Sequence, residues 1–148
     1  MKNIDIERVH NLYNSGAYAE NTSNWEDSTG LQRANALISA LKGNVSNIST
    51  VLDIGCGSGG VLRQISASAP DHSDIFSDDL RLLGCDASCQ AILLAKRSAS
   101  DITNIEYREA LAEDLNQTSQ SFDLVLLIHV LEHVPDMLKL IHEASKMA

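Results

Sequence analysis

Residues 51–60 read Val51-Leu52-Asp53-Ile54-Gly55-Cys56-Gly57-Ser58-Gly59-Gly60, and the rest of the chain can be interpreted outward from them. The first four residues are mostly apolar and partly β-branched, which predicts a buried strand. Four glycines follow within six residues. Glycine tolerates positive φ and lets the backbone approach a ligand closely, because it has no Cβ. Residues 61–65 carry apolar side chains at helical spacing, so the sequence predicts a strand, a tight turn and a helix, which is half of a βαβ unit.

Two classes of ligand use such a turn, and Asp53 distinguishes them. Gly55, Gly57 and Gly60 satisfy the G-x-G-x-x-G pattern of dinucleotide-binding turns, in which a pyrophosphate lies at the helix N-terminus. The Asp53 carboxylate would repel that anion, whereas it would attract a ligand that carries an ammonium and a sulfonium group. A turn without a ligand is the alternative, but crowded glycines cost roughly 0.5–1 kcal/mol each in backbone entropy.

Length and charge exclude several classes of protein. The chain has 148 residues, enough for one domain with its own core. No apolar run approaches the ~20 residues of a membrane span, so we expect no membrane partner. The net charge of −9 disfavours nucleic acid, because an acidic surface repels phosphate backbones. Without an apolar signal region at the N-terminus, we expect a cytoplasmic protein with reduced thiols, a Cys56–Cys85 disulfide being the alternative.

Strand and helix patterns alternate from Thr50 onward and predict an α/β fold with a doubly wound, mostly parallel sheet. The expected strands cover residues 50–54, 80–86, 104–109 and 121–128, and the expected helices cover 31–41, 61–69, 87–96 and 137–147. Residues 71–79 contain four aspartates without periodicity and predict a surface insertion loop.

The N-terminal residues 1–29 are expected to form a cap segment that precedes a domain of residues 30–148. Ile4, Val9 and Leu12 indicate a short amphipathic helix in this segment. The aromatic residues Tyr13, Tyr18 and Trp25 either line a pocket or pin the segment to the domain.

The pattern Asp53-x-Gly55-x-Gly57-x-Gly59 resembles the cofactor motif of class I S-adenosylmethionine-dependent methyltransferases, which have a Rossmann-like core. The resemblance covers about residues 30–148. It implies a methyltransferase that uses S-adenosyl-L-methionine to methylate an oxygen or nitrogen of a small-molecule acceptor. A cofactor-binding module without catalytic activity and a nicotinamide-dependent oxidoreductase are the alternatives.

The expected cofactor site extends to the end of the second strand. Asp86 ends this strand, where an acid in nucleotide-binding α/β folds accepts hydrogen bonds from the ribose diol. An N-cap role is the alternative for Asp86, although Ser88 could cap the same helix. The resemblance further implies that Ala112 and Glu113 contact the adenine, although Leu111 replaces the acid that the family commonly has before them. The expected cofactor-binding residues are Asp53, Gly55, Cys56, Gly57, Gly59, Asp86, Ala87, Ala112, Glu113 and His129.

His129 and His133 follow the fourth strand and are the candidate catalytic bases for a hydroxyl acceptor. Together with Glu132 they match the inverted zincin motif H-x-x-E-H. Some ubiquinone-pathway catechol O-methyltransferases resemble this segment, with Glu-x-x-Glu-His, and hold a divalent ion there. We interpret the three residues as facing the pocket without metal, and we assign no metal ligand.

The family sheet normally has seven strands in the order 3-2-1-4-5-7-6, and four are visible here. We therefore expect a domain that is incomplete at its C-terminus, with the apolar fourth strand as an exposed edge. Two arrangements would cover that edge: further chain of a longer protein, or a second copy of this protein that pairs through the edge as a homo-oligomer. A lone monomer is expected to transfer methyl groups poorly but to bind cofactor weakly.

Overall fold

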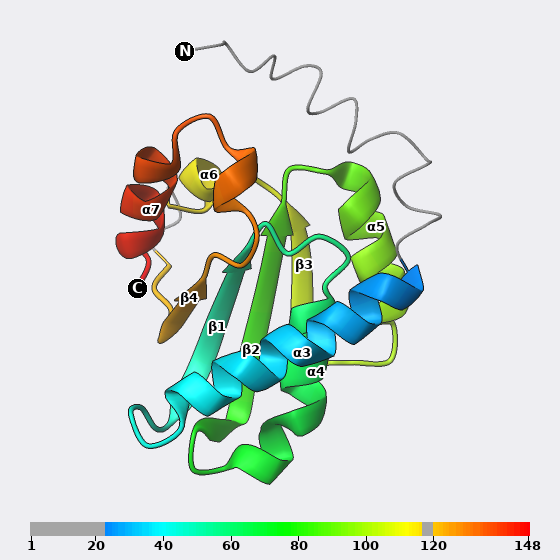
Figure 1. Ribbon diagram of the computed structural model, residues 1–148, viewed down its shortest axis with the longest axis vertical. Coiled ribbons are helices and arrows are strands. Elements are labelled where there is room, and N and C mark those ends of the chain that lie inside the picture. The colour runs from blue at the N-terminus through cyan, green and yellow to red at the C-terminus, as the bar shows by residue number, and fades with distance from the viewer. Residues whose placement is uncertain (1–22, 117–119) are drawn as a thin grey trace.

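The computed structural model describes residues 23–116 and 120–148 (Figure 1). The helix expected near residues 4–12 and the roles expected for Tyr13 and Tyr18 lie outside the described residues, and so does the side chain of Trp25. The helices are α3 (Ser23–Leu41), α4 (Gly60–Ser68), the 3-10 turn η1 (Ala69–His72), α5 (Cys89–Ser98), α6 (Ala112–Asn116), the 3-10 turn η2 (Leu131–His133) and α7 (Met137–Ser145). The strands are β1 (Ile48–Ile54), β2 (Phe76–Asp86), β3 (Ile105–Glu109) and β4 (Leu124–Leu126).

The strands form one parallel sheet in the order β3-β2-β1-β4, which confirms the expected doubly wound α/β fold. The chain first builds outward from β1 to β2 and β3 and then returns to place β4 on the other side of β1. In such sheets the direction of winding reverses between two neighbouring strands, and a crevice opens beyond their carboxyl ends. From this rule a ligand is expected beyond the carboxyl ends of the central strands, where residues 55–60 follow β1 and residues 127–136 follow β4.

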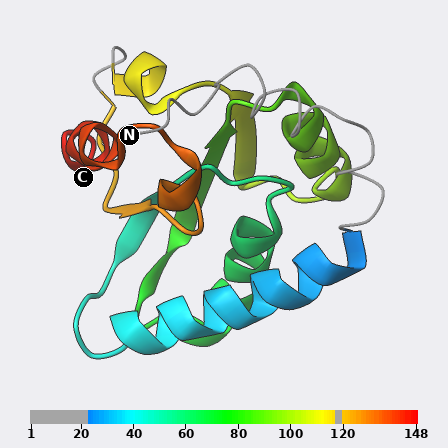
Figure 2. The same ribbon diagram turned by 45° about the horizontal axis from the view of Figure 1, so that its top comes forward.

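Helices cover both faces of the sheet (Figure 2). Val51 and Leu52 are both fully buried and belong to different apolar clusters, as expected for successive residues of a strand that is covered on both sides. One cluster contains residues of α3, α4 and α5, and the other contains residues of α6 and α7. β1 is thus the centre of a three-layered core, and its C-terminal turn is held from both sides.

Helix α3 begins at Ser23, well before the expected start at Leu31, and packs across α4. Gly30 lies at this crossing, where an added Cβ would come within 2.9 Å of the Gly60 backbone. Two glycines therefore let the helices approach closely. The expected boundary between residues 29 and 30 falls inside α3, and the division of the chain at that point stays a prediction.

The insertion loop expected at residues 71–79 is wrong in its second half. β2 begins at Phe76, and both Ile75 and Phe76 are buried. Phe76 pairs with Ile48, and a register shift then separates this pair from the regular ladder that begins at Thr50. Only the first part of the segment, which includes η1, is a surface connection. The aspartates at 78 and 79 lie in a strand whose polar side chains face solvent.

The fourth strand is shorter than expected. The apolar run predicts residues 121–128, but β4 comprises only Leu124–Leu126. At its start the Asp123 side chain accepts hydrogen bonds from the Ser49 and Thr50 amides at 2.8 and 2.9 Å. After its end His129 adopts a positive φ of 53°, which turns the chain out of the sheet. No helix in the described parts of the chain is long and apolar enough to cross a membrane.

Candidate functional site

The glycine turn after β1 contains three left-handed residues, Gly55, Gly57 and Gly59, with φ of 77°, 54° and 78°. Their surroundings differ. A Cβ on Gly55 would collide with Val130, and a Cβ on Gly59 would collide with the Tyr107 phenol. A Cβ on Gly57 would meet no atom of the described residues within 4 Å. Gly57 is therefore the position at which the turn presents its backbone to open space, whereas the other two glycines make room for neighbouring side chains.

Asp86 contacts this turn directly. Its Oδ2 accepts a hydrogen bond from the Gly57 amide at 3.0 Å, and its Oδ1 accepts one from the Ser88 amide at 2.8 Å. The Ser88 hydroxyl in turn accepts from the Ala91 amide at 3.3 Å and caps α5. A carboxylate offers about four lone-pair sites, so these two bonds leave acceptor capacity on Asp86. The adjacent Ala87 is exposed at the same edge of the sheet.

Asp53 is a buried carboxylic acid beneath the turn. Its side chain is 2% exposed, and its Oδ1 has no hydrogen-bond partner among the described residues. Burial, followed by the negative charge of Asp86, raises the pKa of Asp53 from 3.8 to about 7, and the positive charge of Arg33 opposes this rise. An unpartnered buried oxygen of this kind costs about 1–3 kcal/mol. A ligand that brings a hydrogen-bond donor to Oδ1 of Asp53 would remove this cost.

Arg33 was not among the expected site residues. It lies on α3, which packs on the α4 side of the sheet, and its charge reaches Asp53. A single arginine on an amphipathic helix carries no local signal of a binding role, because such residues usually face solvent. Only the packing of α3 across α4 brings this positive charge to the buried acid.

Cys56 takes part in the turn through its backbone. Its side chain is buried in the cluster on the α3 side of the sheet, whereas Cys85 belongs to the cluster on the α7 side. Burial, followed by the charges of Asp53 and Asp86, raises the pKa of the Cys56 thiol. Both thiols are free, so the Cys56–Cys85 disulfide that was the alternative does not form.

Ala112 and Glu113 lie in α6, beyond the end of β3. The Ala112 side chain is buried in the cluster that joins α6 to α7. The Glu113 carboxylate forms an ion pair with Lys139 of α7. The structure thus ties the expected adenine-binding residues to α7, and only backbone groups and the outer side of Glu113 remain for a ligand.

His129 and His133 flank Glu132 on the loop after β4. His129 Nδ1 lies 3.0 Å from Glu132 Oε1, and His133 Nε2 lies 3.9 Å from the same oxygen. The side chains are half exposed, and Val130 between them packs on Gly55 and joins this loop to the glycine turn. η2 is only one 3-10 turn, so the three residues do not share the long helix face of a zincin. Within residues 23–116 and 120–148, no three His, Cys, Asp or Glu side chains are arranged to hold a metal ion.

The parallel sheet, the glycine turn at its switch point and the acids at the ends of β1 and β2 define a Rossmann-like domain. A family model described as "Methyltransferase domain" matches residues 52–148. The chain therefore belongs to this family of methyltransferase domains.

Curated relatives agree with that family. The "Ubiquinone biosynthesis O-methyltransferase" of Hydrogenovibrio crunogenus is 34% identical over 99 residues, which cover 66% of this chain and 37% of the relative. The protein of the same name from Sinorhizobium fredii is 36% identical over 88 residues, which cover 59% of this chain and 32% of the relative. The chain thus spans between 32% and 37% of the length of these two relatives.

Solved structures share the fold. The plantazolicin methyltransferase BpumL, crystallised with a pentazolic desmethylPZN analog and SAH, superposes with a TM-score of 0.68 at 18% identity over 96% of this chain and 56% of its own. The N-terminal domain of EvdMO1 with SAH bound gives 0.64 at 23% identity over 80% of this chain and 45% of its own.

Proposed function

We propose that this chain binds S-adenosyl-L-methionine at the carboxyl ends of β1 and β2 and directs its methyl group to a small-molecule acceptor. The observation that carries the proposal is the buried Asp53, whose Oδ1 has no donor among the described residues and lies below a turn that is open at Gly57. A ligand with an ammonium group would supply the missing donor. A pyrophosphate would face the same acid unfavourably, which disfavours a nicotinamide cofactor.

Under this proposal, each part of the cofactor would meet a particular residue of the site. Arg33 would pair with the carboxylate of the amino-acid moiety, since its positive charge already reaches Asp53. Asp86 would accept hydrogen bonds from the ribose hydroxyls with the lone pairs that Gly57 and Ser88 leave free. Ala87, Ala112 and Glu113 would border the adenine, and Gly55, Cys56, Gly57 and Gly59 would supply backbone to the cofactor.

When bound, the cofactor supplies a methyl group that its sulfonium already activates. The protein's contribution is then to align the acceptor and to exclude water from it. For a hydroxyl acceptor, His129 or His133 would take the proton as the oxygen attacks. Glu132 supports this role, because its carboxylate oxygen lies 3.0 Å from Nδ1 of His129 and can orient the ring.

We propose O-methylation of a hydroxyl as the reaction. The curated relatives named above are O-methyltransferases of ubiquinone biosynthesis, and the loop with His129 and His133 supplies bases suited to a hydroxyl. The further partner we propose is a second copy of this chain at the β4 edge. With free Cys56, Cys85 and Cys89, a reducing compartment such as the cytoplasm suits the protein.

Titration calorimetry of residues 1–148 with S-adenosylhomocysteine and, separately, with NAD tests the proposed cofactor. We expect heat of binding with the first ligand and none with the second. Binding of NAD alone would contradict the proposal. Incubation with methyl-labelled cofactor and paired phenols, one with a free hydroxyl and one already methylated, tests the acceptor. Label in the free phenol alone is expected.

A further inference from the structure

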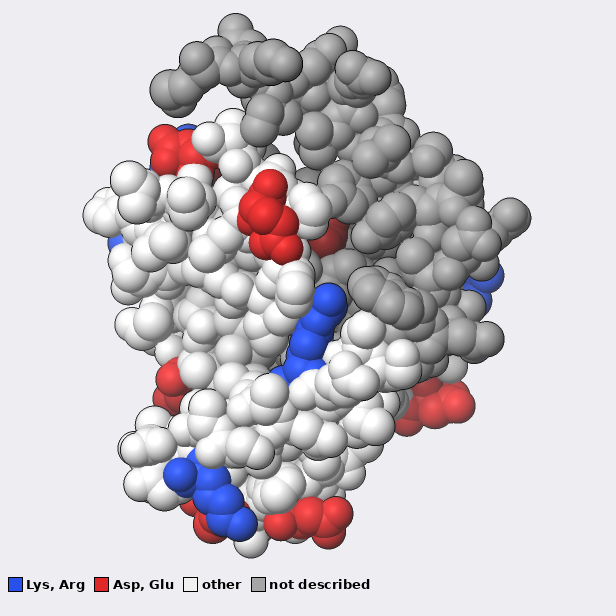
Figure 3. All heavy atoms as spheres, in the orientation of Figure 1, with Lys and Arg blue, Asp and Glu red and all other residues white. Residues whose placement is uncertain are grey.

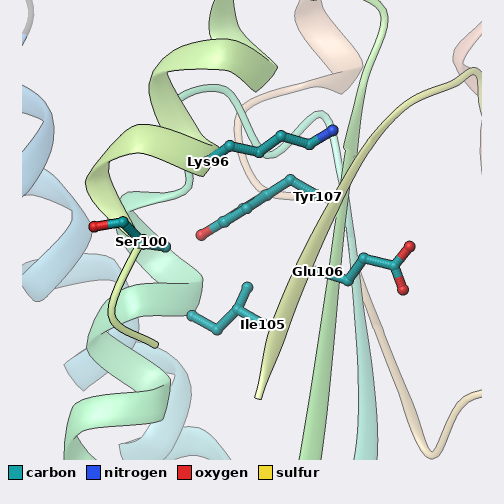
Figure 4. Close-up of a pocket in the computed structure, with 6 residues that line it drawn as sticks. Lys96, Ser100, Ile105, Glu106 and Tyr107 are labelled. Carbon is teal, nitrogen blue, oxygen red and sulfur yellow. The ribbon is translucent and has the colours of Figure 1, made fainter. Parts of the chain in front are cut away.

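Tyr107 is a buried side chain of β3 that extends to the glycine turn. Its strand is separated from β1 by β2, yet its hydroxyl donates a hydrogen bond to the Gly59 carbonyl at 3.1 Å. The residue is 3% exposed. Figure 4 shows the ring extending from β3 on the side opposite to Glu106, with the Lys96 side chain beside it. The local sequence around Tyr107 does not predict its contact with Gly59, because the two residues are 48 positions apart.

Two glycines create the space that the Tyr107 ring occupies. Gly84 is the residue of β2 that pairs with Tyr107 across the sheet, and a Cβ there would lie 2.7 Å from Cδ1 of the ring. A Cβ on Gly59 would collide with the phenol itself. The ring therefore passes over β2 at Gly84 and ends against the turn at Gly59, and neither residue has a side chain in its way.

Tyr107 belongs to a set of three side chains that hold consecutive residues of the turn. Asp86 accepts from the Gly57 amide at 3.0 Å, the Arg63 guanidinium donates to the Ser58 carbonyl at 2.5 Å, and Tyr107 donates to the Gly59 carbonyl. The three come from the end of β2, from α4 and from β3. A glycine-rich turn has many accessible conformations, and each one removed before binding lowers the entropy cost of binding.

We propose that Tyr107 is a positioning residue that fixes the glycine turn in the conformation that receives the cofactor. The inference rests on the proposed function for its effect on affinity, but the ordering of the turn can be measured without any ligand. We attribute the ordering of the turn to the Tyr107 hydroxyl rather than to its ring. The Gly59 carbonyl also accepts from the Arg63 amide at 3.1 Å, so the first turn of α4 remains when the hydroxyl is removed.

The test compares Tyr107→Phe with the parent chain and with Ser66→Ala. Tyr107→Phe keeps the ring in the core and removes one oxygen. Ser66→Ala is the matched control, because it removes a 2.8 Å hydrogen bond from α4 to Asn104, just before β3, without contacting the turn. The hydroxyl bonds the Gly59 carbonyl and also the Arg63 side chain. We expect Tyr107→Phe to weaken binding of S-adenosylhomocysteine about fivefold, because hydrogen bonds of this kind have modest net effects. Amide exchange at residues 57–60 should become faster in the same variant, and both quantities should stay at parent values in Ser66→Ala.

Unchanged affinity and unchanged exchange at residues 57–60 in Tyr107→Phe would overturn the proposal. Equal effects in Ser66→Ala would overturn it as well, because they would show a loss of general stability. If the parent chain fails to bind S-adenosylhomocysteine, the proposed function is wrong. The exchange rates then decide the role of Tyr107 alone: faster exchange in Tyr107→Phe supports it, and parent-like exchange refutes it.

Discussion

At the scale of single residues, the glycines of the turn serve different purposes that their common spacing conceals. Gly55 and Gly59 leave room for Val130 and Tyr107, whereas no side chain of the described residues fills the space beside Gly57. The same steric freedom thus supports packing at two positions and access at the third. Asp53, below the turn, is unusual because its side chain is buried and yet one of its oxygens has no hydrogen-bond partner among the described residues.

Gly57→Ala should separate binding from folding. The new Cβ meets no atom of residues 23–116 or 120–148, so the change costs the strain of a left-handed residue, about 1–2 kcal/mol of unfolding free energy. It also projects into the space proposed for the cofactor, and we expect affinity for S-adenosylhomocysteine to fall tenfold or more. Gly43→Ala is the matched control, because Gly43 has φ of 76° and equally open surroundings in the loop after α3. The control should lose similar stability and keep its affinity; equal affinities in the two variants would show that Gly57 is not at the site.

Asp53 should make the stability of the ligand-free protein depend on pH. Its folded pKa of about 7 lies above the ordinary value of 3.8, so between these values the folded state holds a proton that the unfolded chain releases. Its contribution to the free energy of unfolding therefore decreases as pH rises from about 4 to 7, by at most about 1.4 kcal/mol per pH unit. Urea denaturation at several pH values in this range gives the free energy of unfolding as a function of pH. This free energy should change less with pH for Asp53→Asn than for the parent. A slope that Asp53→Asn leaves unchanged would contradict the buried-acid assignment.

The same acid predicts a pH-dependent affinity. A cationic ligand group beside Asp53 favours the carboxylate, so binding should release a proton and tighten as pH rises toward 7. Calorimetry in two buffers of different ionisation enthalpy would reveal the released proton. Asp53→Asn should bind more weakly and show no release. Equal proton release from both proteins would place the cationic group elsewhere.

At the scale of elements, β4 joins the sheet through one side chain as much as through its backbone. The Asp123 carboxylate accepts from the amide and the hydroxyl of both Ser49 and Thr50, at 2.8 to 3.0 Å. Hydrogen bonds from the side chain and backbone of Ser49, followed by those from Thr50, lower the pKa of Asp123 to about 2. This set of bonds lies where β4 begins, next to β1, the strand that ends in the site.

Asp123→Asn should loosen β4, because all four bonds converge on one charged carboxylate oxygen, which a neutral amide oxygen replaces with a weaker acceptor. Exchange of the amides in Leu124–Leu126 should become several times faster and the melting temperature should fall. Because the folded pKa lies below the ordinary 3.8, the stabilisation is present above about pH 4 and is lost as pH falls toward 2. Asp101→Asn, at an exposed position after α5, is the control and should match the parent. An Asp123→Asn protein with parent-like exchange would refute the role.

Apolar periodicity and turn residues correctly predicted the helices and strands that have a clear local pattern in the sequence. β1, α4 and α5 lie where their apolar spacing and the N-cap Ser88 indicated. The first half of β2 was missed because the polar residues at 77–79 hid the buried Ile75 and Phe76. The extent of β4 was overestimated because an apolar run does not reveal a left-handed residue such as His129. Arg33 and Tyr107 were missed because their contacts depend on tertiary packing.

At the scale of the molecule, charge and apolar surface are distributed unevenly. On the described part of the face in Figure 3, basic side chains are scattered and form no continuous patch, in line with the net charge of −9. Helix α7 carries the large apolar residue with the highest exposed fraction among the described residues, Leu138 at 75%. Met137 and Ile141 of the same helix are 54% and 41% exposed. The opposite side of α7 packs with Ala144 on the sheet beside β4, at the outer edge.

Self-association of residues 1–148 is the outcome expected from this surface, with the second copy covering α7 and the edge of β4. Because each copy carries a charge of −9, added salt should strengthen the association by screening the repulsion between copies. Leu138→Lys should weaken it, since it puts a charge at the most exposed apolar position of α7. Leu93→Lys is the control, because Leu93 is 59% exposed but lies on α5, across the sheet from β4. Sedimentation velocity over a wide range of concentrations measures all three proteins, and a parent chain that stays monomeric in high salt would refute the expected dimer.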